Sequence, residues 1–422
     1  MLVLPLALSW TAALALVLLD GRRPSVGRLA VGALGATFAS TVALAVLVVD
    51  GGERTMVAGG WAPGVGIVLR ADALGVAFAA LSAGVLLAAL VQEVASGVRS
   101  RTFPALVLFL ATGLTGLFLT GDVFNFYVFF ELSMIAAYAL TASGGSAREI
   151  GGAFIFAVVN LLGSFIFLIA IAAIYHVTGT LAMEAVAARL DVVEPSTVIL
   201  IAVAVLVAFS VKLGLFPFHF WLPIVYTGAS PPVAAMLGGA LANIGSYGIL
   251  RFGAELLPRE LELGSVALLV IGGASIVYGS LQAVSRRATP EVLAYSSIGQ
   301  VGYVLVALSI GGRMALAAAV VFSLVNSLNK ALLFLAVGLR GWLVSAAVAI
   351  GALSVTGVPP SAGFFGKAAL FRAGVDSGDV AAVVLLFLGG ALSFVYMFQV
   401  YQHDHWRPAD RPGSRRGPGA GR

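Results

Sequence analysis

Residues 212–223 read Lys-Leu-Gly-Leu-Phe-Pro-Phe-His-Phe-Trp-Leu-Pro, and they end an apolar run that begins near residue 197. Pro217 lacks a backbone donor and clashes with the preceding turn, so a helix that enters this stretch should break there. Broken helices inside a membrane are tolerated where they line a cavity, as in transporters. A lysine beside such a break predicts a polar functional site at mid-membrane. The alternative is a simple proline kink with a lysine that reaches the membrane surface.

The composition around this stretch is that of a membrane protein. Of 422 residues, 60% are apolar and 10% are charged, and the mean hydropathy is +1.05. Apolar runs of about 20 residues recur along the chain, which predicts an all-α polytopic membrane protein with about thirteen spanning helices. The predicted spans are residues 2–19, 27–50, 72–95, 103–120, 122–142, 150–176, 197–222, 229–252, 264–285, 291–310, 313–338, 342–374 and 379–402.

Several function classes are excluded by residue content. The chain has no cysteine, which rules out disulfides, thiol catalysis and thiolate-ligated iron–sulfur clusters. Its four histidines are too scattered for a pair of haems, and His403 and His405 resemble a metal pair only superficially. No phosphate loop, nucleophile elbow or dinucleotide fingerprint is present. We therefore expect no cofactor and no metal, and the net charge of +5 does not indicate nucleic acid.

The distribution of arginines predicts the orientation in the cell membrane. If the N-terminus lies outside, the loops and the adjoining span ends carry 14 arginines inside and 7 outside, and Arg251 is one of the seven. This bias favours an outer N-terminus and a cytoplasmic C-terminus. The first apolar run has no basic residue before it and is followed by Arg22 and Arg23, so we interpret it as a retained helix rather than a signal peptide. Segment 180–192 is predicted to be a short amphipathic helix on the outer surface.

The only three lysines of the chain, Lys212, Lys330 and Lys367, all lie deep inside apolar segments. A lysine in hydrocarbon costs about 2.5–3.5 kcal/mol on insertion scales. Lysine is also the basic side chain whose pKa moves readily on burial, whereas arginine stays charged. Glu131 is placed equally deep, and it would ionise only beside a positive charge. These four residues are therefore predicted to transfer protons. The alternative for Glu131 is a structural ion pair that fixes helix packing.

A second break divides the chain into repeats. Residues 357–367 read Gly-Val-Pro-Pro-Ser-Ala-Gly-Phe-Phe-Gly-Lys, so Lys367 also adjoins a proline-broken span. The interrupted spans are the seventh and the twelfth, five apart. Two tandem blocks of five spans have opposite orientations, which is the pattern of an inverted repeat. The predicted divisions are an N-terminal three-helix segment (1–102), two five-helix repeats (103–252 and 264–402) and a disordered basic tail (403–422).

Amides and one histidine are the auxiliary candidates. Asn326 lies four residues before Lys330 on one helix face, Asn329 is adjacent to that lysine, and Asn243 lies in another span. Water between them could connect the lysines. The alternative is interhelical hydrogen bonding, worth about 0.6–2 kcal/mol each. His219 could relay protons, because the ordinary pKa of histidine is near neutrality; a packed histidine satisfied by backbone is the alternative.

Several stretches in the same order resemble the antiporter-like subunits of Mrp-type Na+/H+ antiporters, respiratory NADH dehydrogenase and membrane-bound hydrogenases. They are residues 124–131 (Phe-Asn-Phe-Tyr-Val-Phe-Phe-Glu), 212–223, 293–303 (Leu-Ala-Tyr-Ser-Ser-Ile-Gly-Gln-Val-Gly-Tyr), 330–335 (Lys-Ala-Leu-Leu-Phe-Leu) and 357–367. Residues 59–72 look most like the D subunit of the Mrp antiporter.

The resemblance implies a glutamate–lysine pair at Glu131 and Lys212 and a terminal lysine at Lys367. It also implies partner membrane subunits. The family usually has a lysine or histidine where this chain has Asn243, a histidine at Asn326, and often an aspartate at Ile224. Two titratable groups are thus replaced by amides, which cannot change protonation at physiological pH. This puts full proton translocation in question.

We interpret the chain as a proton-conducting subunit of a complex that exchanges H+ for Na+ or another monovalent cation. Glu131 would control the charge on Lys212, and protons would pass through water and Lys330 to Lys367, which exchanges with the other side. One alternative is a proton-pumping subunit of a respiratory NADH dehydrogenase or hydrogenase complex, in which this chain carries no electrons. Another is a scaffold that conducts nothing.

Overall fold

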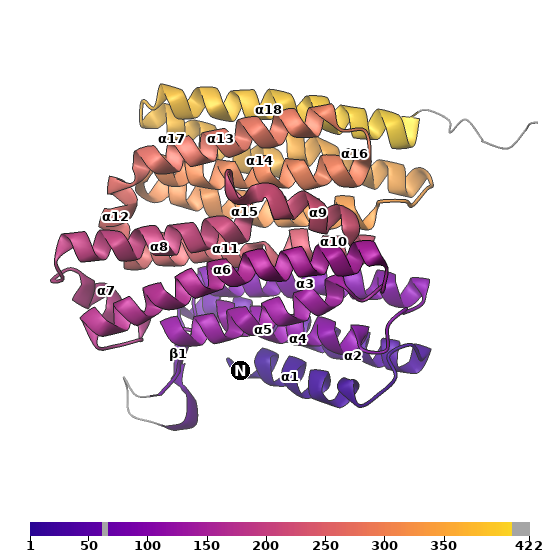
Figure 1. Cartoon of the computed structure of the whole chain (residues 1–422), viewed down its shortest axis with the longest axis horizontal. Helices are drawn as coiled ribbons and strands as arrows, with labels where there is room; N and C mark the ends of the chain where they lie inside the picture. The colour runs from indigo at the N-terminus through magenta and orange to yellow at the C-terminus, as the bar shows by residue number, and fades with distance from the viewer. Residues whose placement is uncertain (61–65, 407–422) are drawn as a thin grey trace, which may run out of the picture.

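The fold is a bundle of long helices that lie side by side, with β1, α7 and α12 at one end (Figure 1). The computed structural model describes residues 1–60 and 66–406. Ten helices in this part of the chain are long and apolar enough to cross a membrane. Three shorter apolar helices, Leu4–Val17, Phe103–Phe118 and Trp342–Thr356, lie among them. The chain is a polytopic membrane protein, as predicted, while the count of thirteen spans stays a prediction.

The N-terminal segment packs its third helix into the middle of the bundle. Its elements are α1 (Leu4–Val17), α2 (Pro24–Gly51), β1 (Arg54–Val57), η1 (Ala58–Gly60), β2 (Val68–Ala71) and α3 (Ala73–Ser96). The two strands form an antiparallel hairpin in which Arg54 pairs with Ala71. Helix α3 packs against α10 and α15, which come from the two predicted repeats. The N-terminal segment is therefore part of the core that holds the repeats together.

The first predicted repeat contains the first broken span. Its elements are α4 (Phe103–Phe118), α5 (Val123–Thr141), α6 (Ala147–Thr178), α7 (Met183–Leu190), α8 (Pro195–Leu213), η2 (Phe218–Phe220), α9 (Trp221–Gly228), α10 (Pro231–Met236), η3 (Leu237–Leu241), α11 (Asn243–Gly248) and η4 (Ile249–Leu256). Asp122 caps α5 by accepting from Asn125 N at 2.6 Å. Ser146 and Glu149 form a capping box on α6. Helix α7 confirms the short helix predicted within 180–192.

The second predicted repeat contains the second broken span. Its elements are α12 (Pro258–Leu263), α13 (Ser265–Ser285), α14 (Thr289–Ile310), α15 (Gly312–Leu335), α16 (Trp342–Thr356), α17 (Ala362–Asp376), α18 (Val380–Tyr401) and η5 (Gln402–Trp406). The last element corrects one boundary. Residues 403–406, assigned to the disordered tail from sequence, continue α18 as a π-helical turn in which Thr289 Oγ1 donates to Asp404 Oδ2 at 2.5 Å. Residues 407–422 lie outside the described part.

Both predicted helix breaks are confirmed, and both have partners for their freed backbone groups. Gly214 (φ 62°) follows the last residue of α8, and Gly357 (φ 80°) follows the last residue of α16. Both have the left-handed conformation that favours glycine. In the first break, Phe216 N donates to Ser275 Oγ at 3.0 Å. In the second, Gly363 N donates to Ser354 Oγ at 3.0 Å. Hydroxyls therefore satisfy the backbone where the helices are interrupted. The inverted relation of the two repeats stays a prediction.

The span that leads from α10 to η4 forms the centre of the bundle. In its apolar 18-residue stretch, 94% of the residues are buried, a larger share than in any other described span. Two of its segments, η3 and η4, are π-helical, a distortion that often accompanies functional sites. Helices α9 and α10 contact α14 and α15, so this region joins the two predicted repeats.

Close packing between α13 and α14 gives a test of the fold. A Cβ on Gly279 would lie 2.8 Å from the Tyr295 carbonyl oxygen and 2.9 Å from Gly299 Cα. Gly279→Ala should therefore force the helices apart and cost about 1–3 kcal/mol, as overpacking does. Gly390→Ala in α18 is the control, because a Cβ there meets nothing within 4 Å. Thermal denaturation in detergent should show a lower midpoint for Gly279→Ala alone, and equal midpoints would contradict the packing.

Candidate functional site

Lys212 lies in the last turn of α8, directly before the first break, and is only 8% exposed. Its Nζ lies 4.0 Å from the centre of the Phe130 ring on α5, a cation–π distance. None of the described residues accepts a hydrogen bond from Nζ. The partial negative charge at the end of α8 also favours a cation there. The kink alternative, in which this lysine reaches the membrane surface, does not fit such burial.

Lys212 and Asn160 line the same small cavity, whose other walls are mostly apolar. The amide Nδ2 of Asn160 donates to Phe156 O at 2.9 Å, whereas its Oδ1 is buried with no partner in the described chain. Both residues line a cavity of about 10 Å³. One water needs about 10–15 Å³ and two or more polar partners. The cavity therefore suits a single water that hydrogen-bonds to the amine and the amide together.

Glu131 follows Phe130 on α5, the residue whose ring Lys212 contacts. Its Oε1 is buried, and within residues 1–60 and 66–406 it has no hydrogen-bond partner. No direct ion pair joins Glu131 to Lys212 or to another described cation. The alternative of a structural ion pair is therefore not supported. The carboxyl and the amine lie on adjacent helices, where they can influence each other through a medium of low dielectric constant without a fixed contact.

Lys330 is fully buried on α15 and is held by α14. Its Nζ donates to Leu293 O at 3.1 Å and also to Ser296 Oγ. One turn earlier, Asn326 has a buried Oδ1 for which the described residues provide no donor. Asn329, beside the lysine, is 8% exposed. Asn326 and Lys330 thus present unsatisfied and satisfied polar groups on the same helix face.

Asn243 ties three helices together instead of standing beside Asn326. Its Nδ2 donates to Ser82 Oγ on α3 at 3.3 Å and to Gly239 O at 3.2 Å. Its Oδ1 accepts from Ser327 Oγ on α15 at 2.6 Å. Ser327, the residue after Asn326, was not among the residues singled out from sequence, and it is the one that reaches this amide. The alternative of interhelical hydrogen bonding is therefore confirmed for Asn243.

Lys367 lies on α17 just after the second break and is 5% exposed. Its Nζ donates to Thr356 O at 3.3 Å, a carbonyl in the last turn of α16. It also donates to Ser393 Oγ on α18 at 3.1 Å and lies 4.9 Å from the centre of the Tyr303 ring. Breaking the span thus supplies one of the two acceptors that hold this amine.

His219 packs among aromatic rings and contacts none of the three lysines in the described chain. Its ring centre lies 5.5 Å from that of Phe216 and 4.3 Å from that of Tyr278. It belongs to η2, beyond the first break. The arrangement places His219 between the broken span and α13, apart from the amines.

An ion network at the end of the bundle that carries β1 (Figure 1) was not predicted from sequence, and it corrects the position of one arginine. Arg251 was counted among the outer-loop arginines, but it is 3% exposed within η4. It pairs with Asp72 at 2.7 Å and with Glu255 at 2.5 Å, and its Nε donates to the Tyr247 hydroxyl at 3.0 Å. Arg70 pairs with both of these acids as well. The network joins β2, the start of α3 and η4.

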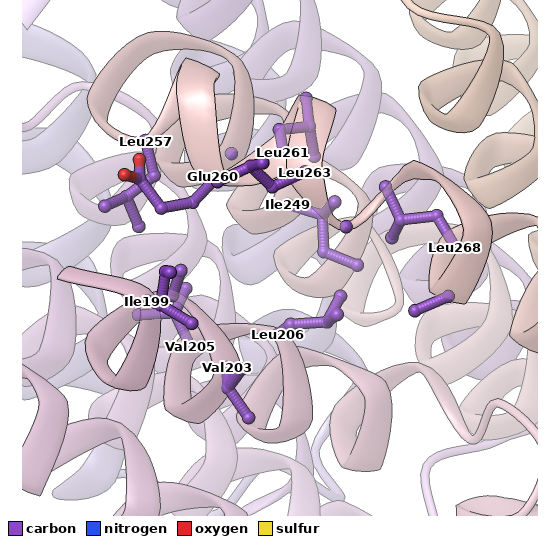
Figure 2. A pocket seen from close by; sticks show the side chains of 14 residues that line it. Ile199, Val203, Val205, Leu206, Ile249, Leu257, Glu260, Leu261, Leu263 and Leu268 are labelled. Carbon is purple, nitrogen blue, oxygen red and sulfur yellow. The ribbon is translucent and has the colours of Figure 1, made fainter. Parts of the chain in front are cut away.

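An apolar groove lies away from the lysines. Figure 2 shows its lining, in which Glu260 is the labelled side chain that carries oxygen atoms. The groove has a volume of about 210 Å³ and is formed by α8, η4, α12 and α13. Because its other lining residues are apolar or glycine, it suits hydrocarbon rather than proton transfer.

These contacts define a class of protein: a polytopic membrane protein with three buried amines, two of which adjoin broken helices. Residues 120–342 match the family model described as NADH:quinone oxidoreductase/Mrp antiporter, TM. The match covers more than half of the chain, and the chain belongs to this family.

Individual relatives agree with this assignment. The chain is 31% identical over 392 residues to the D subunit of the Na(+)/H(+) antiporter of Alkalihalophilus pseudofirmus, covering 87% of this chain and 79% of the relative. It is 32% identical over 411 residues to the N subunit of the NADH-quinone oxidoreductase of Desulforudis audaxviator, covering 91% and 81%. A chain in the structure of the Mrp complex from Dietzia sp. DQ12-45-1b superposes with a TM-score of 0.88 at 30% identity, covering 95% and 80%.

Loss of Arg251 should destabilise the protein strongly. Arg251→Met would leave the partly buried acids Asp72 and Glu255 with Arg70 as their only cationic partner among these pairs, and breaking a buried ion pair costs about 3–5 kcal/mol. Arg372→Met is the control, because its pair with Asp376 is exposed on both sides and such pairs are worth about 0–1 kcal/mol. Denaturation midpoints in lipid nanodiscs measure the difference. Equal midpoints for the two variants would show that the network does not stabilise the fold.

The two buried amines Lys212 and Lys330 should respond differently to replacement by methionine. Lys212→Met removes a buried amine that has no hydrogen-bond partner in the described chain, which relieves a desolvation penalty of about 1–3 kcal/mol. Lys330→Met removes the two hydrogen bonds from Nζ to Leu293 O and Ser296 Oγ, each worth about 0.5–1.5 kcal/mol, although Leu293 O still accepts from the Ser296 and Ser297 hydroxyls. Thermal midpoints should therefore stay level or rise for the first variant and fall for the second. A fall for Lys212→Met as large as that for Lys330→Met would contradict the described contacts.

Proposed function

We propose that this chain is a proton-conducting subunit of a multi-subunit antiporter that exchanges H+ for Na+ or another monovalent cation. The observation that carries the proposal is the burial of Lys212, Lys330 and Lys367 within the membrane, each held by aromatic rings, hydroxyls or carbonyls. Lysine is rarely kept at such depth unless it functions there. The D subunit of the Na(+)/H(+) antiporter and the Mrp complex among its relatives support this choice.

The first step of the proposed mechanism couples Glu131 to Lys212. Ionised Glu131 favours the charged form of the lysine across the Phe130 side chain, and neutral Glu131 releases this bias. At an effective dielectric constant of about 20, charges about 8 Å apart still interact by about 2 kcal/mol. A change at Glu131 thus alters how readily Lys212 gives its proton to the cavity it shares with Asn160.

Later steps carry the proton toward the second break. Lys330 receives it through water, and Asn326 offers a buried carbonyl oxygen on the same face. Asn243 and Ser327 hold α11 and α15 at a fixed separation, so their role in this mechanism is to position the route. Lys367 is the last amine, placed between the freed carbonyl of Thr356 and Ser393.

Assembly and orientation complete the proposal. The chain would work with other membrane subunits in the cell membrane, with its N-terminus outside and its C-terminus in the cytoplasm. It would be a transporter subunit and not itself an enzyme. The excess of arginine in the segments assigned to the cytoplasm supports the orientation.

A second candidate function is a proton-pumping subunit of a respiratory complex, favoured by the similarity to the N subunit of an NADH-quinone oxidoreductase. The two candidates differ in their partners. Flavin or iron–sulfur proteins that co-purify with this chain would indicate the respiratory complex, and small hydrophobic subunits would indicate the antiporter. A scaffold that conducts nothing is disfavoured, because Glu131, Lys212 and Lys367 are all retained.

Replacing the coupled pair should abolish transport. In everted vesicles that contain the complete complex, Glu131→Gln and Lys212→Met should each lower the initial rate of cation-driven pH change by about tenfold or more, equal to at least about 1.4 kcal/mol in the barrier. Glu262→Gln, an exposed acid on α12, is the control. Rates like those of the unmodified complex in both Glu131→Gln and Lys212→Met would refute the mechanism.

A further inference from the structure

Helix α18 carries a row of polar side chains, and the first of them, Ser393, contacts Lys367 of α17. Ser393, Tyr396, Gln399 and His403 follow one another at spacings of three, three and four residues, so they share one face of the helix and its π-helical continuation. Ser393 and Tyr396 are both 0% exposed, in a helix that otherwise presents many apolar side chains to lipid. The row runs from mid-membrane to the end of the bundle opposite β1, α7 and α12 (Figure 1).

Hydrogen bonds hold the two hydroxyls of this row that lie nearest to Lys367. Lys367 Nζ donates to Ser393 Oγ at 3.1 Å. Ser393 Oγ itself donates to Gly390 O at 2.7 Å, and Tyr396 lies one turn further along the same face of α18. Gln300 of α14, which is 2% exposed, donates from Nε2 to that hydroxyl at 2.9 Å. Because Gln300 donates to the tyrosine oxygen, the tyrosine O–H remains available to another acceptor.

The other end of the row, at Gln399 and His403, opens into a polar cavity, which we call the vestibule. It has a volume of about 680 Å³ and lies between the end of α13, the start of α14 and the end of α18. Its polar lining includes Arg286, Arg287, Gln399, Gln402 and His403. Gln399 Oε1 is buried and has no donor among residues 1–60 and 66–406. A cavity of this size and polarity holds many waters.

We propose that Ser393, Tyr396 and Gln300 form a proton-transfer route that connects Lys367 with the vestibule. The inference rests on the proposed function, because it assumes that Lys367 exchanges protons. It assigns Lys367 a connection to the arginine-rich end of the bundle.

Each transfer conserves atoms and charge. The Ser393 hydroxyl first turns from Gly390 O toward the Tyr396 oxygen; charged Lys367 then gives a proton to Ser393 Oγ while the hydroxyl proton of Ser393 passes to the Tyr396 oxygen. The hydroxyl proton of Tyr396 then passes to water beside Gln399. Lys367 ends neutral, both hydroxyls end as they began, and one proton reaches the vestibule. Serine and tyrosine suit this step because each hydroxyl both donates and accepts.

The vestibule lining favours a route for protons rather than for metal cations. No carboxylate lies among the described residues that line it, whereas two arginines do. Hard cations such as Na+ bind carboxylate and carbonyl oxygens, and a pair of guanidinium groups opposes their approach. A proton crosses the buried part of the route by exchange between hydroxyls and needs no cation-sized pore.

Removal of a single hydroxyl tests the route. In everted vesicles with the complete complex, Tyr396→Phe and Ser393→Ala should each slow cation-driven pH change by about fivefold or more. Tyr401→Phe, on the same helix, should leave the rate unchanged, because no described hydrogen bond uses its hydroxyl. A normal rate in Tyr396→Phe, together with an inactive Lys367→Met, would overturn the route and leave the proposed function standing. A normal rate in Lys367→Met would overturn the proposed function itself.

Water access to the row gives an independent test that does not depend on transport. Because the chain has no cysteine, a thiol introduced at Gln399→Cys is unique in it. A membrane-impermeant thiol reagent should modify this variant from the face that carries Arg286 and Arg287, as detected by the mass of this chain in the intact complex. Phe398→Cys, which is 44% exposed on the lipid side of the same helix, should stay unmodified. No reaction at Gln399→Cys, or reaction only from the opposite face, would overturn the vestibule connection.

Discussion

The structure depends on one constraint: an amine placed in hydrocarbon must be solvated by the protein itself. The three lysines meet this constraint in different ways. Lys212 uses an aromatic face and the end of a helix, Lys330 uses a hydroxyl and a carbonyl from the neighbouring helix α14, and Lys367 uses a carbonyl freed by a break. A break or a neighbouring hydroxyl therefore accompanies each amine, and the interruptions in α8–α9 and α16–α17 follow from this need.

Groups with many partners and groups with few have different roles. The Arg251–Asp72–Glu255 network and the amide of Asn243 are fully engaged, and they tie the N-terminal segment to both predicted repeats. By contrast, Lys212 Nζ, Glu131 Oε1 and Asn326 Oδ1 lack partners in the described chain. Satisfied polar networks stiffen a membrane protein, whereas unsatisfied ones attract water and change partners easily. Rigid supports around hydrated, changeable groups are what proton transfer requires.

Sequence predicted the parts that rest on strong local chemistry. Pro217 and Pro359 mark the breaks, and lysine is rare enough in apolar segments for each one to stand out. The sequence did not predict that the hydroxyls of Ser296, Ser327 and Ser393 contact these polar groups. Serine is common at helix contacts, and only tertiary packing selects the serines that meet an amine or amide. Arg251 and Asp72 lie 179 residues apart, so no local pattern joins them. Spacing along α15 singled out Asn326 beside Lys330 but not Ser327, because spacing along one helix does not show which face meets the next.

The most direct test of the account uses the scarcity of lysine. If lysine labelled with ¹⁵N at Nζ is incorporated in this chain alone and the chain is assembled into its complex, nuclear magnetic resonance should detect three side-chain amines. The account predicts that these amines change protonation over the pH range in which the complex transports, and that Glu131→Gln alters the titration of Lys212. Three amines that keep one protonation state throughout that range would contradict it.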